Sequence, residues 1–168
     1  MKAALMLAVG VALAASAARA TDHIGIYGDA TGNTCTLAAG FSSTGTIIHT
    51  SSTGAVESGF TVSVANAPGS TLLGFNSSYQ TVCINPPCPF SYGECRTSVV
   101  VGTLIATLSS GYIEVVSPTD PSLPPFVIDC NDEVHNAIGG RAYIAGTGEC
   151  LPLATESSTW GSVKALYR

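Results

Sequence analysis

Alternation of large and small side chains marks the clearest strand in the sequence. Phe60, Val62 and Val64 alternate with smaller residues, so the large side chains share one face, and the pattern predicts a half-buried strand at residues 59–65. Residues 98–108 are almost continuously apolar. Such a run predicts a central strand that is covered on both faces and bends at its glycine.

Further short strands are expected on both sides of these two. A Ser-Ser-Gly turn separates residues 98–108 from residues 112–116, which predicts a hairpin. Other strand candidates are residues 23–27, 46–50, 71–75, 125–130 and 138–145. About eight short strands with turn residues between them predict an all-β fold, an antiparallel β-sandwich of immunoglobulin-like size, with a barrel as the alternative.

Two segments break the strand pattern. Residues 117–125 contain four prolines, which cannot donate to a sheet ladder, so we expect a loop that changes edge or sheet. Residues 155–168 begin as a polar linker and end in a tail. Within that tail Trp160, Val163 and Tyr167 have helical spacing, which predicts a short C-terminal helix.

The start of the chain has the features of a secretory signal peptide. Residues 1–20 combine Lys2, an apolar run and small residues before Ala20, and cleavage after Ala17 is the alternative. The apolar run is shorter than the roughly 20 residues that span a membrane. We therefore expect a secreted, periplasmic or cell-surface protein with one sandwich domain at residues 21–154.

The net charge of the chain disfavours some classes of binding partner. Without the leader, four basic residues stand against eleven acidic ones, a formal charge of −7. Binding to nucleic acid or to an anionic membrane surface would work against this field. A protein or a glycan is the expected partner.

Cysteines suggest a cross-linked scaffold. Six follow the leader: Cys35, Cys83, Cys88, Cys95, Cys130 and Cys150. An even number in an exported chain predicts three disulfides. The C-x4-C-x6-C spacing in the proline-rich segment lacks the paired ligands of a zinc site, and its prolines disfavour the helix of a thioredoxin-type redox centre.

The sequence does not determine which cysteines are bonded to each other, because six cysteines allow 15 pairings. Our preferred pairing joins Cys130 to Cys150, which follow two strands expected to be neighbours. Cys35 would pair with one cysteine of the proline-rich segment at residues 81–95, and the remaining two would close that segment on itself.

Two groups of residues are candidate metal sites. If cleavage falls after Ala20, the sequence Thr21-Asp22-His23 resembles the amino-terminal copper- and nickel-binding motif of serum albumins, whose nitrogens surround Cu²⁺ or Ni²⁺ in a plane.

The second group is rich in oxygen. Asp129, Asn131, Asp132 and Glu133 could bind Ca²⁺, although Val134 occupies the position where an EF-hand loop needs glycine. The alternative is a polar turn after a strand, in which aspartate or asparagine side chains bond local backbone amides.

A hydrolase is the alternative function class. His49, His135, Asp129 and serines could assemble a Ser-His-Asp site, although residues 40–44 lack the last glycine of a nucleophile elbow. His49 is expected to be an exposed strand histidine, and no catalytic residue is assigned.

Three aromatic residues are a candidate binding patch. Tyr79, Phe90 and Tyr92 border the proline-rich segment and could form an exposed surface for a ligand, or they could cover a disulfide.

The two ends of the chain add a resemblance. The tail STWGSVKALYR and the opening HIGIYGDATGNTC, together with the leader, resemble a group of uncharacterised exported bacterial proteins with similar termini. The resemblance implies export and no particular activity. The sequence thus predicts a secreted β-sandwich that acts as a binding or structural module of the cell envelope or exterior.

Overall fold

A computed structural model describes residues 22–81, 89–146, 148 and 150. Within them the chain forms strands and loops without a helix, so no helix there could cross a membrane. The strands are β1 His23–Tyr27, β2 Thr36–Leu37, β3 Gly40–Gly59, β4 Thr61–Ser63, β5 Thr71–Ser77, β6 Gln80–Thr81, β7 Phe90–Leu108, β8 Tyr112–Val116, β9 Phe126–Asp129, β10 Val134–Asn136, β11 Ile138–Gly139 and β12 Arg141–Ile144. The leader, the linker and the predicted helical tail lie outside the described residues.

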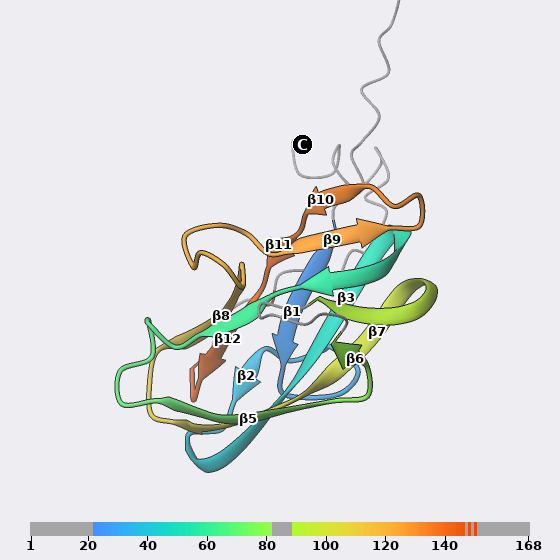
Figure 1. Cartoon of the computed structure of the whole chain (residues 1–168). Coiled ribbons are helices and arrows are strands. Elements are labelled where there is room, and N and C mark those ends of the chain that lie inside the picture. The colour runs from blue at the N-terminus through green and yellow to red at the C-terminus, as the bar shows by residue number, and fades with distance from the viewer. Residues whose placement is uncertain (1–21, 82–88, 147, 149, 151–168) are drawn as a thin grey trace, which may run out of the picture.

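The strands form two sheets that share one core, which confirms the predicted β-sandwich (Figure 1). Most pairs are antiparallel as predicted, but β1 pairs with β11 and β2 with β12 in parallel, so both sheets are mixed. The larger sheet has the order β10-β9-β3-β1-β11 and continues through β7, which pairs with β3, β5 and β6. The smaller sheet has the order β2-β12-β8-β4. Two separate sheets exclude the barrel alternative among the described strands.

The long strands β3 and β7 are paired along most of their length and organise the larger sheet. On its other edge, β3 pairs with β1 in its first part and with β9 in its last part. Alternate residues of these strands enter the core, among them Ile24, Ile47, Val99, Val101 and Leu104. Ile113, Val115 and Ile144 approach from the smaller sheet. The common core joins the two layers.

Several local predictions are correct. The alternating segment at residues 59–65 contains β4, with Phe60 buried and Val62 and Val64 packed against the core. The proline-rich loop at residues 117–125 leads from β8 in the smaller sheet to β9 in the larger one, so it does change sheet.

Other predictions are wrong because strand partners come from distant parts of the chain. β8 pairs with β12 and β4 rather than with β7, so residues 98–116 do not form a hairpin. Instead, the chain crosses to the other sheet at Gly111, and the amide of Tyr112 donates to the carbonyl of Asn66. Residues 98–108 are covered on one face only, since Val100 is 48% exposed.

The disulfides differ from the preferred pairing. Cys35 bonds to Cys150 and Cys95 bonds to Cys130, with Cα–Cα distances of 5.3 and 5.5 Å. The expected Cys130–Cys150 bond is wrong because residues 138–145 split into β11 in the larger sheet and β12 in the smaller one. Cys130 follows β9 in the larger sheet and therefore lies near β7, which carries Cys95.

The remaining cysteines, Cys83 and Cys88, lie outside the described residues. A bond between them, which would close the proline-rich segment on itself, stays a prediction.

Gly54 lies where β3 passes the Cys95–Cys130 disulfide. Its φ of +88° is a conformation that favours glycine, and a Cβ at this position would lie 2.6 Å from the sulfur of each cysteine. The register between β3 and β7 also shifts between Thr50 and Ala55. The bend in β3 and the position of the disulfide therefore both depend on the absence of a side chain here.

Replacement Gly54→Ala should lower the free energy of unfolding by about 2–4 kcal/mol, because it adds an unfavourable backbone conformation and a steric clash. Gly74→Ala is the matched control. A Cβ at Gly74 would have no neighbour within 4 Å and no φ in the left-handed range. Urea unfolding of both variants measures the difference, and equal midpoints would contradict the account.

Candidate functional site

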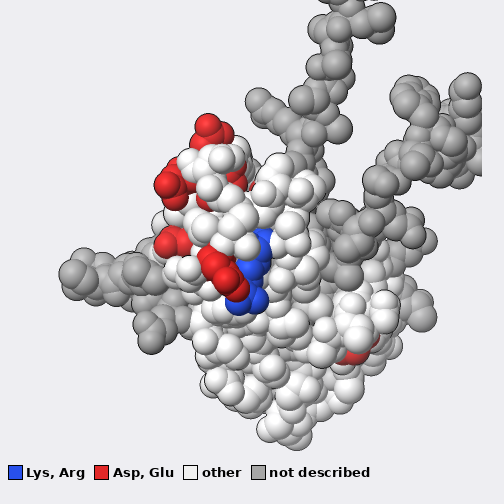
Figure 2. Space-filling view, turned by 90° about the vertical axis from the view of Figure 1, so that its right-hand side faces the viewer, with Lys and Arg blue, Asp and Glu red and all other residues white. Residues whose placement is uncertain are grey.

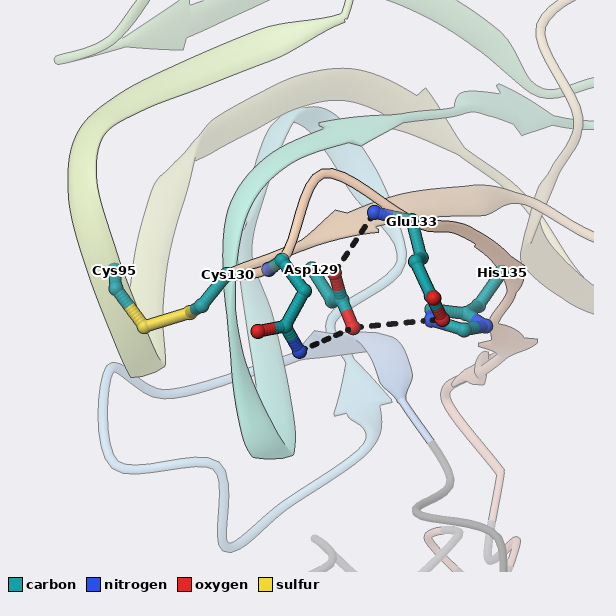
Figure 3. A network of polar contacts seen from close by, with 6 residues as sticks. Cys95, Asp129, Cys130, Glu133 and His135 are labelled. Carbon is teal, nitrogen blue, oxygen red and sulfur yellow. Dashed lines mark hydrogen bonds and ion pairs between the residues drawn. A yellow bond between two sulfur atoms is a disulfide. The ribbon is translucent and has the colours of Figure 1, made fainter.

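Asp129 anchors the turn between β9 and β10. Its Oδ1 accepts hydrogen bonds from the backbone amides of Asn131 and Glu133, at 2.8 and 2.9 Å (Figure 3). Asp132, with a φ of +63°, lies in the same turn. This arrangement is the polar turn that was the alternative to a calcium loop.

A histidine from the second strand of the hairpin reaches the same carboxylate. Nε2 of His135 lies 3.2 Å from Oδ2 of Asp129 and 3.8 Å from Oε2 of Glu133. The amide of Glu133 and the other donors hold the pKa of Asp129 down at about 2. Asp129, Glu133 and His135 form the one group among the described residues whose possible ligand atoms converge, all within 4.8 Å of one another.

The structure therefore brings together only some of the residues that were predicted to bind calcium. Asp132 is exposed and is not in the converging group. The side-chain nitrogen of Asn131 lies 3.4 Å from Oδ2 of Asp129, so this amide contacts the aspartate rather than an open site. The sequence pattern identified Asp129 and Glu133 but did not include His135 among the ligands.

The predicted copper-binding start does not fit the structure where it is described. Thr21 lies outside the described residues, and Asp22 and His23 are buried, only 3% and 4% exposed. His23 is the first residue of β1 and is paired with Thr50 of β3 and Ile138 of β11. A strand position held on both sides cannot fold around an ion as the motif requires.

His49 is buried rather than exposed, contrary to the expectation from sequence. Nδ1 of His49 lies 2.9 Å from the hydroxyl of Tyr92, which donates a hydrogen bond to the hydroxyl of Ser58. Burial lowers the pKa of His49 to about 4, with a smaller contribution from the charge of His23. Burial likewise raises the pKa of Tyr92.

The two histidines available for a hydrolase lie in different environments. His135 contacts Asp129 and Glu133, whereas His49 contacts Tyr92 and reaches Ser58 only through it. Among the described residues, no serine hydroxyl, histidine and carboxylate follow one another in hydrogen-bonding order. The scattered residues therefore do not assemble the predicted alternative of a Ser-His-Asp site.

The predicted aromatic patch does not form as a single exposed surface. Tyr92 is 5% exposed, and Tyr79 packs edge-on against it at a ring distance of 5.2 Å. Phe90 faces elsewhere, stacking on Phe60 at 5.0 Å and meeting Phe75 edge-on at 5.4 Å. Phe90 therefore belongs to a separate aromatic cluster.

This aromatic cluster lines an apolar pocket of about 360 Å³. The pocket lies between β4 of the smaller sheet and β5 of the larger one, above Ile47 and Leu104 of the core. Its walls are formed by Phe60, Val62, Leu72, Leu73, Phe75 and Phe90. Phe60 and Val62 were recognised as one face of a strand, but nothing in the local sequence showed that β5 would lie opposite them.

Comparisons with known proteins leave the family open. No family model matches the chain, and no curated protein matches it. Among solved structures, the chain is similar to a cohesin module from a family 33 glycoside hydrolase of Clostridium perfringens ATCC13124. The identity is 10% and the TM-score 0.43, over 74% of this chain and 97% of that one. The fold and the sites described above rest on this chain's own geometry.

Acid should destabilise the fold through His49. Its imidazole takes up a proton near pH 6.5 when unfolded but only near pH 4 when folded, so stability present above pH 6.5 is lost as the pH falls toward 4. The loss from this group is about 3 kcal/mol, and the lowered pKa of His23 acts in the same direction. Urea unfolding at several pH values measures it.

Replacement His49→Gln should reduce the slope of stability against pH between 6.5 and 4. Asp29→Asn is the control, because the pKa of Asp29 is lowered from 3.8 to about 2 and its contribution is lost only below that window. An unchanged slope in His49→Gln would show that His49 is not the buried neutral group.

Proposed function

We propose that the protein is a secreted, disulfide-cross-linked β-sandwich that binds an apolar segment of a partner protein in the pocket between β4 and β5. The observation that carries the proposal is the pocket itself, with three phenylalanine rings in contact. Ligand-binding sites in proteins are usually concave and lined mostly by apolar and aromatic side chains.

The lining favours an apolar group over a sugar. Thr61 is its one residue with a polar side chain, and the rings are those of phenylalanine, which have no polar edge. Figure 2 shows a face on which charged side chains gather in the upper part, whereas the lower part, at the level of β5 in Figure 1, is almost free of them. An uncharged segment of a protein therefore suits this surface better than a glycan.

The strands beside the pocket support binding of an extended segment. Among the described residues, β4 pairs only with β8 and β5 only with β7, so each strand has a free edge. A free edge can add a strand by main-chain hydrogen bonds, while alternate side chains of that strand enter a pocket. The partner we propose is thus an extended peptide with alternating apolar residues.

The disulfides support the proposal that the protein is exported. Disulfides persist in oxidising compartments, and the two described bonds connect segments 115 and 35 residues apart in the chain. The leader at residues 1–20 points to the same compartment. We therefore place the protein at the cell envelope or outside the cell.

Filling the pocket should weaken binding of an apolar probe. Val62 is half-buried on the pocket side of β4, so Val62→Trp places an indole where the ligand would lie. The affinity for the neutral dye N-phenyl-1-naphthylamine, measured by fluorescence titration, should fall about tenfold or more, which corresponds to about 1.4 kcal/mol.

Val134→Trp is the matched control. Val134 is 68% exposed on β10, at the opposite end of the molecule from β5 (Figure 1), so the added indole leaves the pocket open. Dye binding should match that of the unmodified protein. If the unmodified protein does not bind the dye, or if Val62→Trp binds it equally well, the pocket is not a binding site.

A further inference from the structure

We propose that Asp129, Glu133 and His135 bind a divalent transition-metal ion of the zinc class at the β9–β10 turn. This site is separate from the apolar pocket and does not depend on the function proposed for it. The three side chains come from a single hairpin, with Asp129 at the end of β9 and His135 on β10 (Figure 3).

Two of the three separations between the donor atoms are close to those of a metal site, and all three are within 4.8 Å. Ligands about 2.1 Å from a tetrahedral zinc ion lie about 3.4 Å from one another. Oδ2 of Asp129 and Nε2 of His135 are 3.2 Å apart, and Nε2 of His135 and Oε2 of Glu133 are 3.8 Å apart. Because Glu133 and His135 are 71% and 43% exposed, a small rotation of either can complete the geometry.

Asp129 is the least mobile of the three proposed ligands, because backbone amides hold its carboxylate. Oδ1 of Asp129 is occupied by two amides of its own turn, while Oδ2 faces the histidine. The next residue, Cys130, is tied to Cys95 of β7. Hydrogen bonds that orient a ligating carboxylate raise metal affinity because less freedom is lost on binding.

A buried carboxylate beside this group gives an independent reason to expect a cation. Asp22 is 3% exposed, and its Oδ1 has no hydrogen-bond partner. Its backbone carbonyl accepts a hydrogen bond from the amide of Ile138, just beyond β10. Burial raises the pKa of its carboxyl group, while the hydroxyl of Ser51 and the charge of His135 lower it. A buried carboxylate oxygen without a hydrogen-bond partner is costly, and a cation held at His135 and Asp129 would reduce this cost.

The donor set selects the class of metal. Calcium takes six to eight oxygen ligands, whereas an imidazole nitrogen with carboxylates suits zinc and its neighbours. Three ligands from the protein leave at least one position open for water or for a group from a partner. The inferred site therefore differs from the predicted calcium loop both in its ligands and in its ion.

Calorimetric titration of the tag-free protein with zinc chloride tests the proposal. One equivalent should bind, and His135→Ala and Glu133→Gln should each weaken binding by at least about tenfold. Both side chains are exposed, so unfolding curves without metal should show both variants folded. Glu94→Gln removes an exposed acid from β7 and should bind zinc as the unmodified protein does.

Two further measurements test the zinc site. Zinc should raise the unfolding midpoint of the unmodified protein more than that of either ligand variant. Millimolar calcium chloride should not displace the zinc. The proposal is overturned if zinc does not bind stoichiometrically, if calcium competes at equal concentration, or if the His135→Ala, Glu133→Gln double variant binds as tightly as the unmodified protein.

Discussion

The Cys95–Cys130 disulfide, which lies against Gly54 of β3, joins the part of the larger sheet where β3, β7 and β9 meet. At this point β3 changes its register on β7, and the disulfide joins β7 to the residue that follows β9. This disulfide joins residues 35 positions apart, and by the chain-entropy estimate it stabilises the folded state by about 4 kcal/mol. The disulfide also fixes the start of the turn in which Asp129 orders the backbone.

Below this point, the same pair of strands has a different role. Ile47 of β3 and Leu104 of β7 form the floor of the apolar pocket, while β4 and β5 form its sides. Between Ile47 and Gly54, the buried polar side chains of His49 and Ser51 on β3, with that of Asp22 just before β1, interrupt the apolar core and leave several polar atoms without partners. One part of the sandwich therefore carries buried polar groups, including the histidine whose protonation weakens the fold in acid, and the other carries an apolar surface suited to binding.

Local features were predictable from sequence, and distant pairings were not. Alternation around Phe60 identified β4, and the prolines before Phe126 identified a change of sheet. Local periodicity does not show which strands become neighbours, so the partner of β8 and the bond of Cys130 were missed. At the proposed metal site, the turn residues in the sequence indicated Asp129, but His135 lies close to Asp129 only because β10 pairs with β9. His49 is buried in β3, which pairs with β1 on one side and β7 on the other.

Direct mapping of the disulfides tests the central constraint most simply. Proteolysis of the protein without reduction, followed by mass spectrometry, identifies which cysteine peptides are joined. We expect one linked pair containing Cys95 and Cys130 and another containing Cys35 and Cys150. A peptide joining Cys130 to Cys150, or free thiols at Cys95 and Cys130, would contradict the account.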